Sequence, residues 1–502
     1  MGAAVLIAAF ILGTLAAVAF QADASRGLTP SDWVTLRFTL KQAILSALIS
    51  ILLAIPVARA LARRRFYGRR ALITLLGAPF ILPVIVAIFG LLQVFGRSGW
   101  ISDLLGIFGF PPIRVYGLHG VVLAHVFFNL PLATRLILQG WQEIPAERFR
   151  LAAQLGCNGK TMFRLIELPM LVRIIPGAAA VIFAICLTSF AVALTLGGGP
   201  RATTLELAIY QAFTYEFDLG RAAHLSAIQL GLTALAAGIA LKLSNNDGFG
   251  SGLDRATRRW DTAPPVWDAL WIVFASTFLL LPLASVVMSG ILGLLELPTQ
   301  VFRAAFVSIC VAITSTIILL ALALPMAASI AVGRKGLVEL SGILGLAASP
   351  LVLGTGLFII IRPFANPIDL ALPITAFVNA IMALPFALRI LAPAARDAVT
   401  EHTHLAQSLN MNRWTFFTRV LIARIRPQIG FAAGLAAALS MGDLGIISLF
   451  ADASTATLPL QIYRLMGAYQ MDAAAAGALL LLVLSMGAFW LLDQGGRWHA
   501  EA

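Results

Sequence analysis

Charged residues are scarce in this sequence. Of its 502 residues, 12% are charged and 60% are hydrophobic, whereas soluble proteins average about 25% charged residues. A soluble domain, even one with a large core, normally has a larger fraction of charged residues than this chain. The composition therefore predicts an all-α polytopic membrane protein, in which each span takes about 20 apolar residues.

Cysteine is also rare, and its spacing carries no motif. Cys157, Cys186 and Cys310 fit neither a disulfide framework nor a metal site. The sequence likewise has no two-histidine metal motif, and no Ser/His/Asp set lies in a plausible soluble domain. We therefore expect packing roles for the cysteines, no metal site, and no cofactor bound by this chain.

A nucleotide-binding loop is missing as well. Gly159-Lys160-Thr161 looks like the end of a P-loop, but that motif requires another glycine five residues before Gly159, where Gln154 stands. No strand is expected before it. If ATP drives this protein, hydrolysis belongs to a separate chain, and we predict that this chain is not an enzyme.

The positive charge follows the pattern of membrane topology. The net charge is +12, but no basic patch is interleaved with aromatic residues, as single-stranded nucleic acids require, so we expect no nucleic-acid partner. The run from Arg63 to Arg70 holds five arginines. Cytoplasmic loops are enriched in Lys and Arg, so this loop and the N-terminus are predicted to face the cytoplasm.

Apolar runs predict about twelve transmembrane helices. A polar segment, 244–265, carries the pair Pro264-Pro265 and is predicted to be a cytoplasmic linker between a first half, 1–243, and a second half, 266–502. Polar loops are expected at 21–41 and, outside the membrane, at 96–118. The predicted spans are 3–20, 43–61, 71–95, 120–138, 176–196, 222–243, 267–287, 307–332, 337–361, 372–391, 430–450 and 473–492.

The two halves repeat each other. Leu130-Pro131-Leu132-Ala133-Thr134-Arg135 matches Leu384-Pro385-Phe386-Ala387-Leu388-Arg389, and the segment from Thr204 to Tyr210 matches that from Thr457 to Tyr463. Six helices per half give both copies the same orientation in the membrane. The repeats are therefore predicted to be parallel, related by an axis along the membrane normal.

The most polar long segment of the first half is 147–169. We expect a short helix around Ala152 and Ala153, a sharp turn at Gly156, and a second amphipathic helix that ends at Pro169. Such a surface helix-turn-helix can bind a soluble partner. The repeat places a degenerate copy at 401–423, in which Asn410 replaces Gly156; Asn also tolerates a left-handed turn.

Polar residues inside spans are costly and often functional. Asp443 is expected in a late helix, aligned by the repeat with Ser189, and either lines a pathway or forms an interhelical hydrogen bond. His125, Asn129 and Asn379 are expected to bond between helices. Asn129, Ser189 and Asp443 are the candidates for a translocation path.

In each half, one amphipathic segment follows the fifth span on the outer side of the membrane. They are interpreted as re-entrant or surface helices that either contact a delivering protein or simply pack as a lid. The candidate contact residues are Glu206, Tyr210, Gln461 and Tyr463.

Four stretches and one spacing carry a family resemblance. The stretches are 124–131, 151–156, 196–204 and 441–445, and nine residues separate Gly156 from Ile166-Glu167-Leu168-Pro169. The spacing resembles the EAA loop of bacterial ABC-importer permeases, although Arg150 stands where that family has a glutamate. Over nearly the whole chain, the sequence resembles the fused thiamine permeases of these importers.

The resemblance implies a multi-pass permease of the bacterial inner membrane. It implies two copies of a cytoplasmic ATPase, which bind ATP and Mg, and a periplasmic thiamine-binding protein. The residues implied to couple to the ATPase are Arg150, Ala152, Ala153, Leu155, Gly156, Ile166, Leu168, Pro169, Leu405, Ala406 and Asn410. Thiamine, its phosphates and iron(III) stay open as cargo, and a proton-coupled transporter of twelve helices is the rival mechanism.

Overall fold

The computed structural model describes residues 2–498 apart from 23–26, 78–80, 198, 200, 244–264, 295–296, most of 334–348, and 453–454. The regular elements of these residues are all helices. Eleven helices of the described chain are long and apolar enough to cross a membrane, and a shorter apolar helix spans Pro350–Ile361. The predicted all-α polytopic fold is confirmed.

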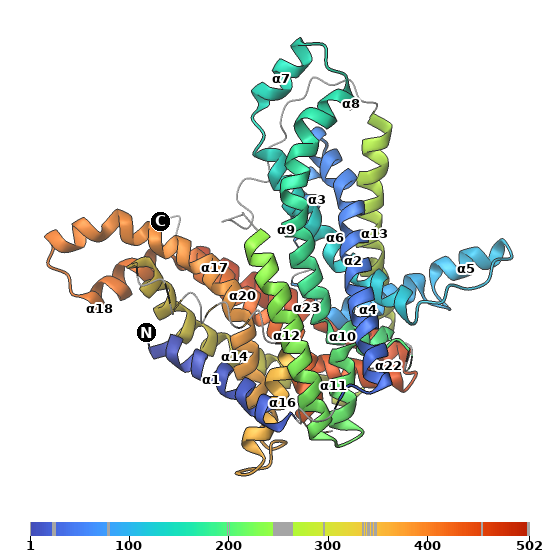
Figure 1. Ribbon diagram of the computed structural model, residues 1–502, viewed down its shortest axis with the longest axis vertical. Helices are drawn as coiled ribbons and strands as arrows, with labels where there is room; N and C mark the ends of the chain where they lie inside the picture. The colour runs from blue at the N-terminus through green and yellow to red at the C-terminus, as the bar shows by residue number, and fades with distance from the viewer. Residues whose placement is uncertain are drawn as a thin grey trace.

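Six of these candidate spans lie in the first half of the chain, with several short helices between them (Figure 1). The elements are α1 (Gly2–Gln21), α2 (Pro30–Arg63), α3 (Arg69–Leu75), α4 (Val84–Phe95), α5 (Trp100–Ile107), α6 (Leu118–Gln142), α7 (Ala146–Gln154), α8 (Gly159–Met162), the π-helix η2 (Phe163–Glu167), α9 (Leu168–Leu187), α10 (Phe190–Leu196), α11 (Leu205–Thr214) and α12 (Leu219–Leu243).

The second half repeats this order. Pro56 lies inside α2 and Pro325 inside α14, and Pro131 and Pro385 lie inside α6 and α17. The elements are α13 (Pro265–Gly293), α14 (Thr299–Ala331), α16 (Pro350–Ile361), α17 (Ala371–Ser408), α18 (Arg413–Thr415), the π-helix η4 (Phe416–Leu421), α19 (Ile422–Arg424), α20 (Arg426–Met441), α21 (Gly445–Phe450), α22 (Leu458–Gly467) and α23 (Met471–Arg497).

Helix α2 begins earlier than the sequence predicts. The polar segment 21–41 was expected to be a loop, but its second part is helical from Pro30. Thr29 and Asp32 form a capping box: the Thr29 hydroxyl accepts from the Asp32 N–H at 3.2 Å, and the Asp32 carboxylate accepts from the Thr29 N–H at 3.0 Å. These bonds satisfy two amides at the helix start, so polar residues can lie in its first turns.

The span expected at 71–95 is two helices, α3 and α4. Pro83 is the N-cap of α4, and a proline has no N–H with which to continue a preceding helix. The predicted outer loop 96–118 contains a helix, α5, whose start follows Gly99. Ser102 of α5 is buried and donates to the Gly96 carbonyl at 2.7 Å, which ties the start of α5 to the end of α4.

The spans expected at 176–196 and 430–450 are each broken. Helix α9 ends at Leu187 and α10 begins at Phe190, while α20 ends at Met441 and α21 begins at Gly445. Asp443 was predicted to lie inside a helix, but it lies in the break between α20 and α21. Its Oδ1 accepts from the Gly445 N–H at 3.1 Å, and such local bonds compete with helix continuation.

Two predicted segments fall partly or wholly where the structure describes little. The linker 244–265 lies outside the described residues except for Pro265, which starts α13, so the division into halves stays a prediction. Of the span expected at 337–361, the structure describes α16 from Pro350 onward as a continuous helix.

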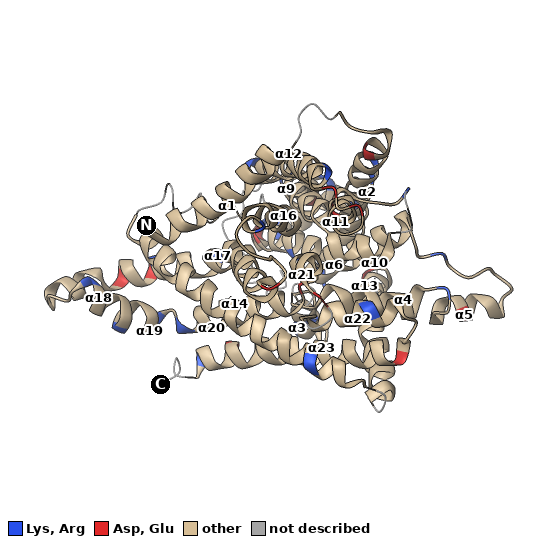
Figure 2. Ribbon diagram, turned by 90° about the horizontal axis from the view of Figure 1, so that it is seen from below, with Lys and Arg blue, Asp and Glu red and all other residues tan. Residues whose placement is uncertain are grey.

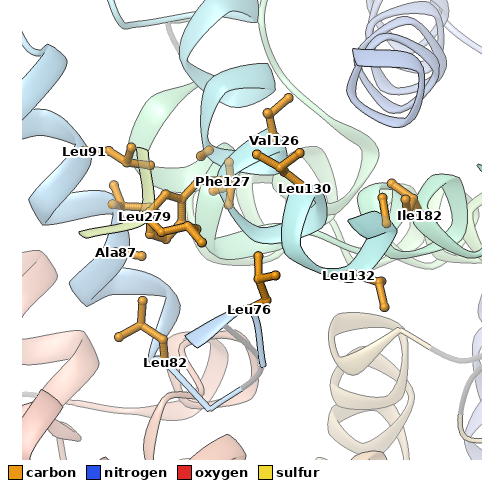
Figure 3. Packing of buried hydrophobic residues seen from close by; sticks show 14 of the residues in the cluster. Leu76, Leu82, Ala87, Leu91, Val126, Phe127, Leu130, Leu132, Ile182 and Leu279 are labelled. Carbon is orange, nitrogen blue, oxygen red and sulfur yellow. The ribbon is translucent and has the colours of Figure 1, made fainter. Parts of the chain in front are cut away.

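The first helix of each half packs against elements of both halves. Helix α13, from the second half, packs against α4 and α2 of the first half as well as α23 of its own half. Helix α1, from the first half, packs against α16 of the second half as well as α12 of its own half. In the core of the first half, Leu279 of α13 lies beside Phe127 and Ala87 (Figure 3). The rings of Phe127 and Phe278 are 5.9 Å apart, edge to face. The halves are thus interleaved rather than separate domains.

The polar ends of the molecule project away from this core. Figure 1 shows α7 and α8 at the top of the view, α18 at the left, and α11, α16 and α22 spread across the lower part. Figure 2 shows few charged positions over most of the ribbon and several on the arm of α18 and α19. The two segments predicted to bind a soluble partner therefore lie far from each other.

Candidate coupling segments and membrane path

Helix α7 ends in a turn centred on Gly156. The φ angle of Gly156 is +70°, in the left-handed region that favours glycine. The Gly156 N–H donates to Ala153 O at 3.1 Å, and the Cys157 N–H donates to Ala152 O at 3.0 Å. These two bonds make a Schellman motif, which satisfies the last carbonyls of α7. The sharp turn expected at Gly156 is present.

The second half builds the same turn without a glycine. Asn410 has φ +50°, its N–H donates to Gln407 O at 3.0 Å, and the Met411 N–H donates to Ala406 O at 2.9 Å. Asn is one of the few residues with a side chain that tolerates this conformation. The degenerate segment therefore keeps the backbone geometry of the first.

The two turns share a second feature, an asparagine cap, that is not among the features predicted from the sequence. The Asn158 side chain accepts from the Thr161 N–H at 2.9 Å, and the Asn412 side chain accepts from the Thr415 N–H at 2.7 Å. Each asparagine caps the helix after the turn. The sequence signal for these caps is present in both halves: an Asn stands two residues after the turn residue and three residues before a Thr.

Pro169 does not end the second helix of the segment, contrary to the prediction. The helix runs from α8 through η2 into α9, with Pro169 in the first turn of α9. In the π-turn, the Leu168 N–H bonds to Phe163 O. In the π-turn the backbone hydrogen bonds run from residue i to residue i−5 instead of i−4, and this change comes just before Pro169, which has no N–H to donate. The coupling segment is thus continuous with a membrane span.

Both segments expose a pair of leucines on their first helix. Leu151 and Leu155 are 58% and 73% exposed, and their repeat partners Leu405 and Leu409 are 57% and 63% exposed. Apolar side chains exposed together often mark an interaction site. An open hollow beside α7 is lined by Glu147, Arg148, Arg150, Leu151 and Gln154.

The other predicted coupling residues divide between surface and interior. Among those of the first segment, Arg150, Leu168 and Pro169 are exposed, Ala153 and Ile166 are half-buried, and Ala152 is buried. In the second segment, Ala406 is half-buried and Asn410 is exposed. The structure therefore brings the two leucine pairs, the turns and Arg150 to the surface, and uses Ala152 for packing.

The polar residues of the inner spans bond between helices. Asn129 donates to Cys186 Sγ at 3.3 Å, and Asn379 donates to Ser440 Oγ at 3.1 Å. His125 Nδ1 lies 3.2 Å from Ser46 Oγ. These contacts match the structural role expected for His125, Asn129 and Asn379, and they place Asn129 between α6 and α9 of one half.

Ser189 and Asp443 lie at equivalent breaks, one in each half. The Asp443 segment approaches the other half closely, since a Cβ added at Gly442 would lie 3.0 Å from Pro83 Cα. Pro83 precedes α4 of the first half. Asp443 therefore lies where the halves meet, while its role in translocation stays a prediction.

The outer helices α11 and α22 exist as predicted, but their candidate contact residues are mostly inside. Glu206, Tyr210 and Gln461 are buried, and Tyr463 is half-buried. Glu206 accepts from Gln229 Nε2 at 2.9 Å. In this structure Glu206, Tyr210 and Gln461 do not face solution, which corrects the idea that they form a contact surface for a binding protein.

Each outer helix is anchored in the same way. The Leu205 N–H donates to Thr39 Oγ1 at 2.9 Å, and the Leu458 N–H donates to Ser308 Oγ at 2.8 Å. The hydroxyls belong to α2 and α14, at equivalent positions of the repeat. Hydroxyl residues inside apolar helices were the only sequence signal for these anchors.

Metal ligands are not gathered in the described part of the chain, where no group of three His, Cys, Asp or Glu residues could hold an ion. The three cysteines are free thiols. Cys186 accepts from Asn129, as described above, and so takes part in packing between α6 and α9.

Comparison with known proteins identifies the relatives of this chain. No family model matches it. The thiamine transport system permease protein ThiP of Salmonella typhimurium is 40% identical over 482 residues, which cover 93% of this chain and 90% of that protein. Its counterpart from Escherichia coli is 39% identical over 479 residues, covering 92% and 89%. The counterpart from Brucella abortus is 38% identical over 508 residues, covering 98% and 93%.

These likenesses extend over both halves and confirm the resemblance found in the sequence. A permease subunit spans the membrane and leaves ATP hydrolysis to other subunits, in agreement with the expected multi-pass, non-enzymatic chain. The chain therefore belongs to the family of thiamine transport system permeases of bacterial ABC transporters.

Proposed function

We propose that this chain is the membrane permease of an ATP-driven importer that carries thiamine into the cytoplasm by alternating access. The observation that carries the proposal is the 38–40% identity to thiamine transport permeases along nearly the full chain. The fused arrangement, with both membrane halves in one polypeptide, is supported by the repeated elements. Thiamine phosphates remain part of the cargo class.

Two copies of a cytoplasmic ATPase are the proposed partners on the inner side. The support is the pair of equivalent turns at Gly156 and Asn410, each followed by an asparagine cap and preceded by two exposed leucines. Two similar surfaces fit two copies of one partner. ATP and Mg are proposed to bind that partner, since this sequence offers no P-loop.

The permease is proposed to receive thiamine from a periplasmic binding protein. The buried positions of Glu206, Tyr210 and Gln461 leave the exposed ends of α11 and α22 for this contact. Tyr215 and Phe217 follow α11, Tyr469 follows α22, and all three are exposed. Of the residues proposed from sequence for this contact, Tyr463 alone is partly accessible.

The path for the cargo is proposed to run between the halves, past the Asp443 break. Thiamine carries a permanent positive charge, and an ion crosses hydrocarbon only at great cost. A carboxylate where the halves meet would offset that charge. Ser189 takes the equivalent place in the first half and is uncharged, so the path would be acidic on one side only.

Stimulated ATP hydrolysis tests the assignment of cargo. The permease and its ATPase are reconstituted in proteoliposomes, and the binding protein is added loaded with thiamine, loaded with iron(III), or empty. We expect the thiamine-loaded protein to stimulate hydrolysis well above the empty one. Stimulation by the iron-loaded form alone would keep the transporter class and overturn the substrate.

A further inference from the structure

A network of ion pairs joins the first coupling segment to two membrane helices. Arg59 Nε lies 2.7 Å from Glu167 Oε2, and Arg64 Nε lies 2.7 Å from Asp268 Oδ2. Arg63 lies between the two acids, 4.0 Å from Glu167 Oε1 and 3.8 Å from Asp268 Oδ1. We call these five residues the charge link.

The acids of the charge link are shielded from solvent. Glu167 is 0% exposed and Asp268 is 7% exposed. Buried carboxylates are tolerated when they are paired and hydrogen-bonded, and removing one partner is strongly unfavourable. Arg59 also lies over the Phe163 ring, with 4.9 Å from Cζ to the ring centroid. Because the acids are buried while Arg59 and Arg64 are partly exposed, salt screens these pairs less than it screens fully exposed ones.

The charge link lies at a mechanical junction. Glu167 ends the π-turn η2, where the coupling segment passes into α9. The three arginines lie at the end of α2, and Asp268 lies in the first turn of α13. Figure 1 shows the ends of α2, α8 and α13 at the same side of the molecule. Since α13 belongs to the second half, the link crosses from one half to the other.

Among the described residues of the second half, this arrangement has no counterpart. The repeat aligns Glu167 with Leu421, and Arg59 and Arg63 with Ala328 and Val332. Helix α1, the counterpart of α13, contains no charged residue. Because these positions are apolar in the second half, the repeated fold does not itself require the ion pairs. Their presence beside the more complete coupling segment points to a function there.

We propose that the charge link makes the first coupling segment, the end of α2 and the start of α13 move as one body when the ATPase changes state. A push on the Gly156 turn then reaches the second half through Glu167, Arg63 and Asp268. These residues are positioning residues, which act on transport without touching the cargo. The proposal rests on the family assignment but not on thiamine as the cargo.

Spin labels test the mechanical statement directly. Cysteines replace Lys160 in α8 and the exposed Val266 in α13, in a chain without its native cysteines, and the complex with its ATPase is measured without nucleotide and after trapping with ATP and vanadate. We expect one narrow distance that is the same in both states. In Asp268→Asn, the distance should shift or broaden on trapping. Asp493→Asn, which breaks the Arg497–Asp493 pair within α23, is the matched control and should behave like the parent.

Transport gives the second measurement. In Asp268→Asn and Arg64→Gln, thiamine uptake per ATP hydrolysed should fall by about tenfold, within the range of measured site-to-site couplings, while Arg64→Lys, which keeps the charge, should retain most of it. A parent distance that changes on trapping as much as the variant distance overturns the proposal, as does normal uptake per ATP in both variants. If the single variants do not accumulate, the swapped pair Arg64→Asp with Asp268→Arg replaces them. A swapped pair that accumulates but stays uncoupled also overturns it.

A failure of the cargo assignment is distinguishable from a failure of the link. A parent complex that takes up no thiamine counts against the proposed substrate alone. The label distances need only the permease, the ATPase and nucleotide, so they judge the charge link in either case.

Discussion

Gly156 and Asn410 show how two residues reach one backbone conformation. Both have positive φ angles, +70° and +50°, and both close a Schellman turn. Around Gly156 there is open space, since a Cβ would meet no heavy atom within 4 Å. The requirement for glycine there is thus conformational rather than steric.

Gly156→Val should uncouple ATP hydrolysis from transport, or prevent ATPase binding, while the protein still inserts. A left-handed conformation costs an L-residue roughly 1–2 kcal/mol, and a β-branched residue resists it further, so the turn should rearrange. Uptake and hydrolysis in proteoliposomes measure the effect. Gly159→Val is the matched control: Gly159 also has open space, but its φ is not positive. Asn410→Gly should be mild, and normal transport by Gly156→Val would refute the coupling role of the turn.

Asp443→Asn should lower thiamine uptake while leaving insertion and ATPase binding intact. Asparagine keeps an oxygen that can accept from the Gly445 N–H, at 3.1 Å in the parent, but it removes the negative charge that would attract a cation. We expect uptake to fall by about tenfold, the equivalent of about 1.4 kcal/mol. Ser189→Ala, at the equivalent break, is the control with little expected effect. Equal uptake by Asp443→Asn and the parent would remove Asp443 from the path.

At the scale of elements, the sequence predicts the helices better than their interruptions. Long apolar runs predict the spans, and the internal repeat predicts the positions of both coupling segments. The breaks before α10 and α21 were missed because apolar composition continues through them, and hydropathy does not register a carboxylate that bonds the local backbone. The burial of Glu206 was missed because the charged residue pairs with Gln229 of α12, far along the chain.

The exposed leucines of α7 allow a test of docking. Leu155→Ser should weaken ATPase binding by roughly tenfold, because full burial of one Leu side chain contributes about 1.5–3 kcal/mol. Binding is measured by titrating the ATPase onto detergent-solubilised permease. Gln154→Ser changes the exposed neighbour without removing apolar surface and should bind as the parent does. If both variants bind equally well, the leucine pair is not the docking surface.

At the scale of the whole molecule, the packing of each first helix against the other half was not predictable from the sequence. The repeat fixes which elements correspond, but each first helix could pack within its own half alone with the same local pattern. Side-chain packing between the halves, such as Phe278 of α13 against Phe127 of α6, determines where each first helix lies. The same packing brings Arg64 to Asp268, 204 positions later in the chain.

The orientation in the membrane is open to a direct test. We expect the loop from Arg63 to Arg70, the coupling segment and the linker 244–265 to face the cytoplasm, because Lys and Arg gather in cytoplasmic loops. In a chain lacking its native cysteines, Tyr67→Cys should resist an impermeant thiol reagent added to intact cells. Phe110→Cys, in the segment predicted to be outside, should react. Labelling of Tyr67→Cys from outside would overturn the topology.

The most direct test of the whole account is the energy source of thiamine uptake. Proteoliposomes containing the permease and its ATPase are given labelled thiamine on its binding protein, with either ATP on the ATPase side or an imposed proton gradient. The account predicts accumulation that requires ATP and the binding protein and persists when a protonophore is present. Accumulation driven by the proton gradient without ATP would contradict it and would make the chain a secondary transporter.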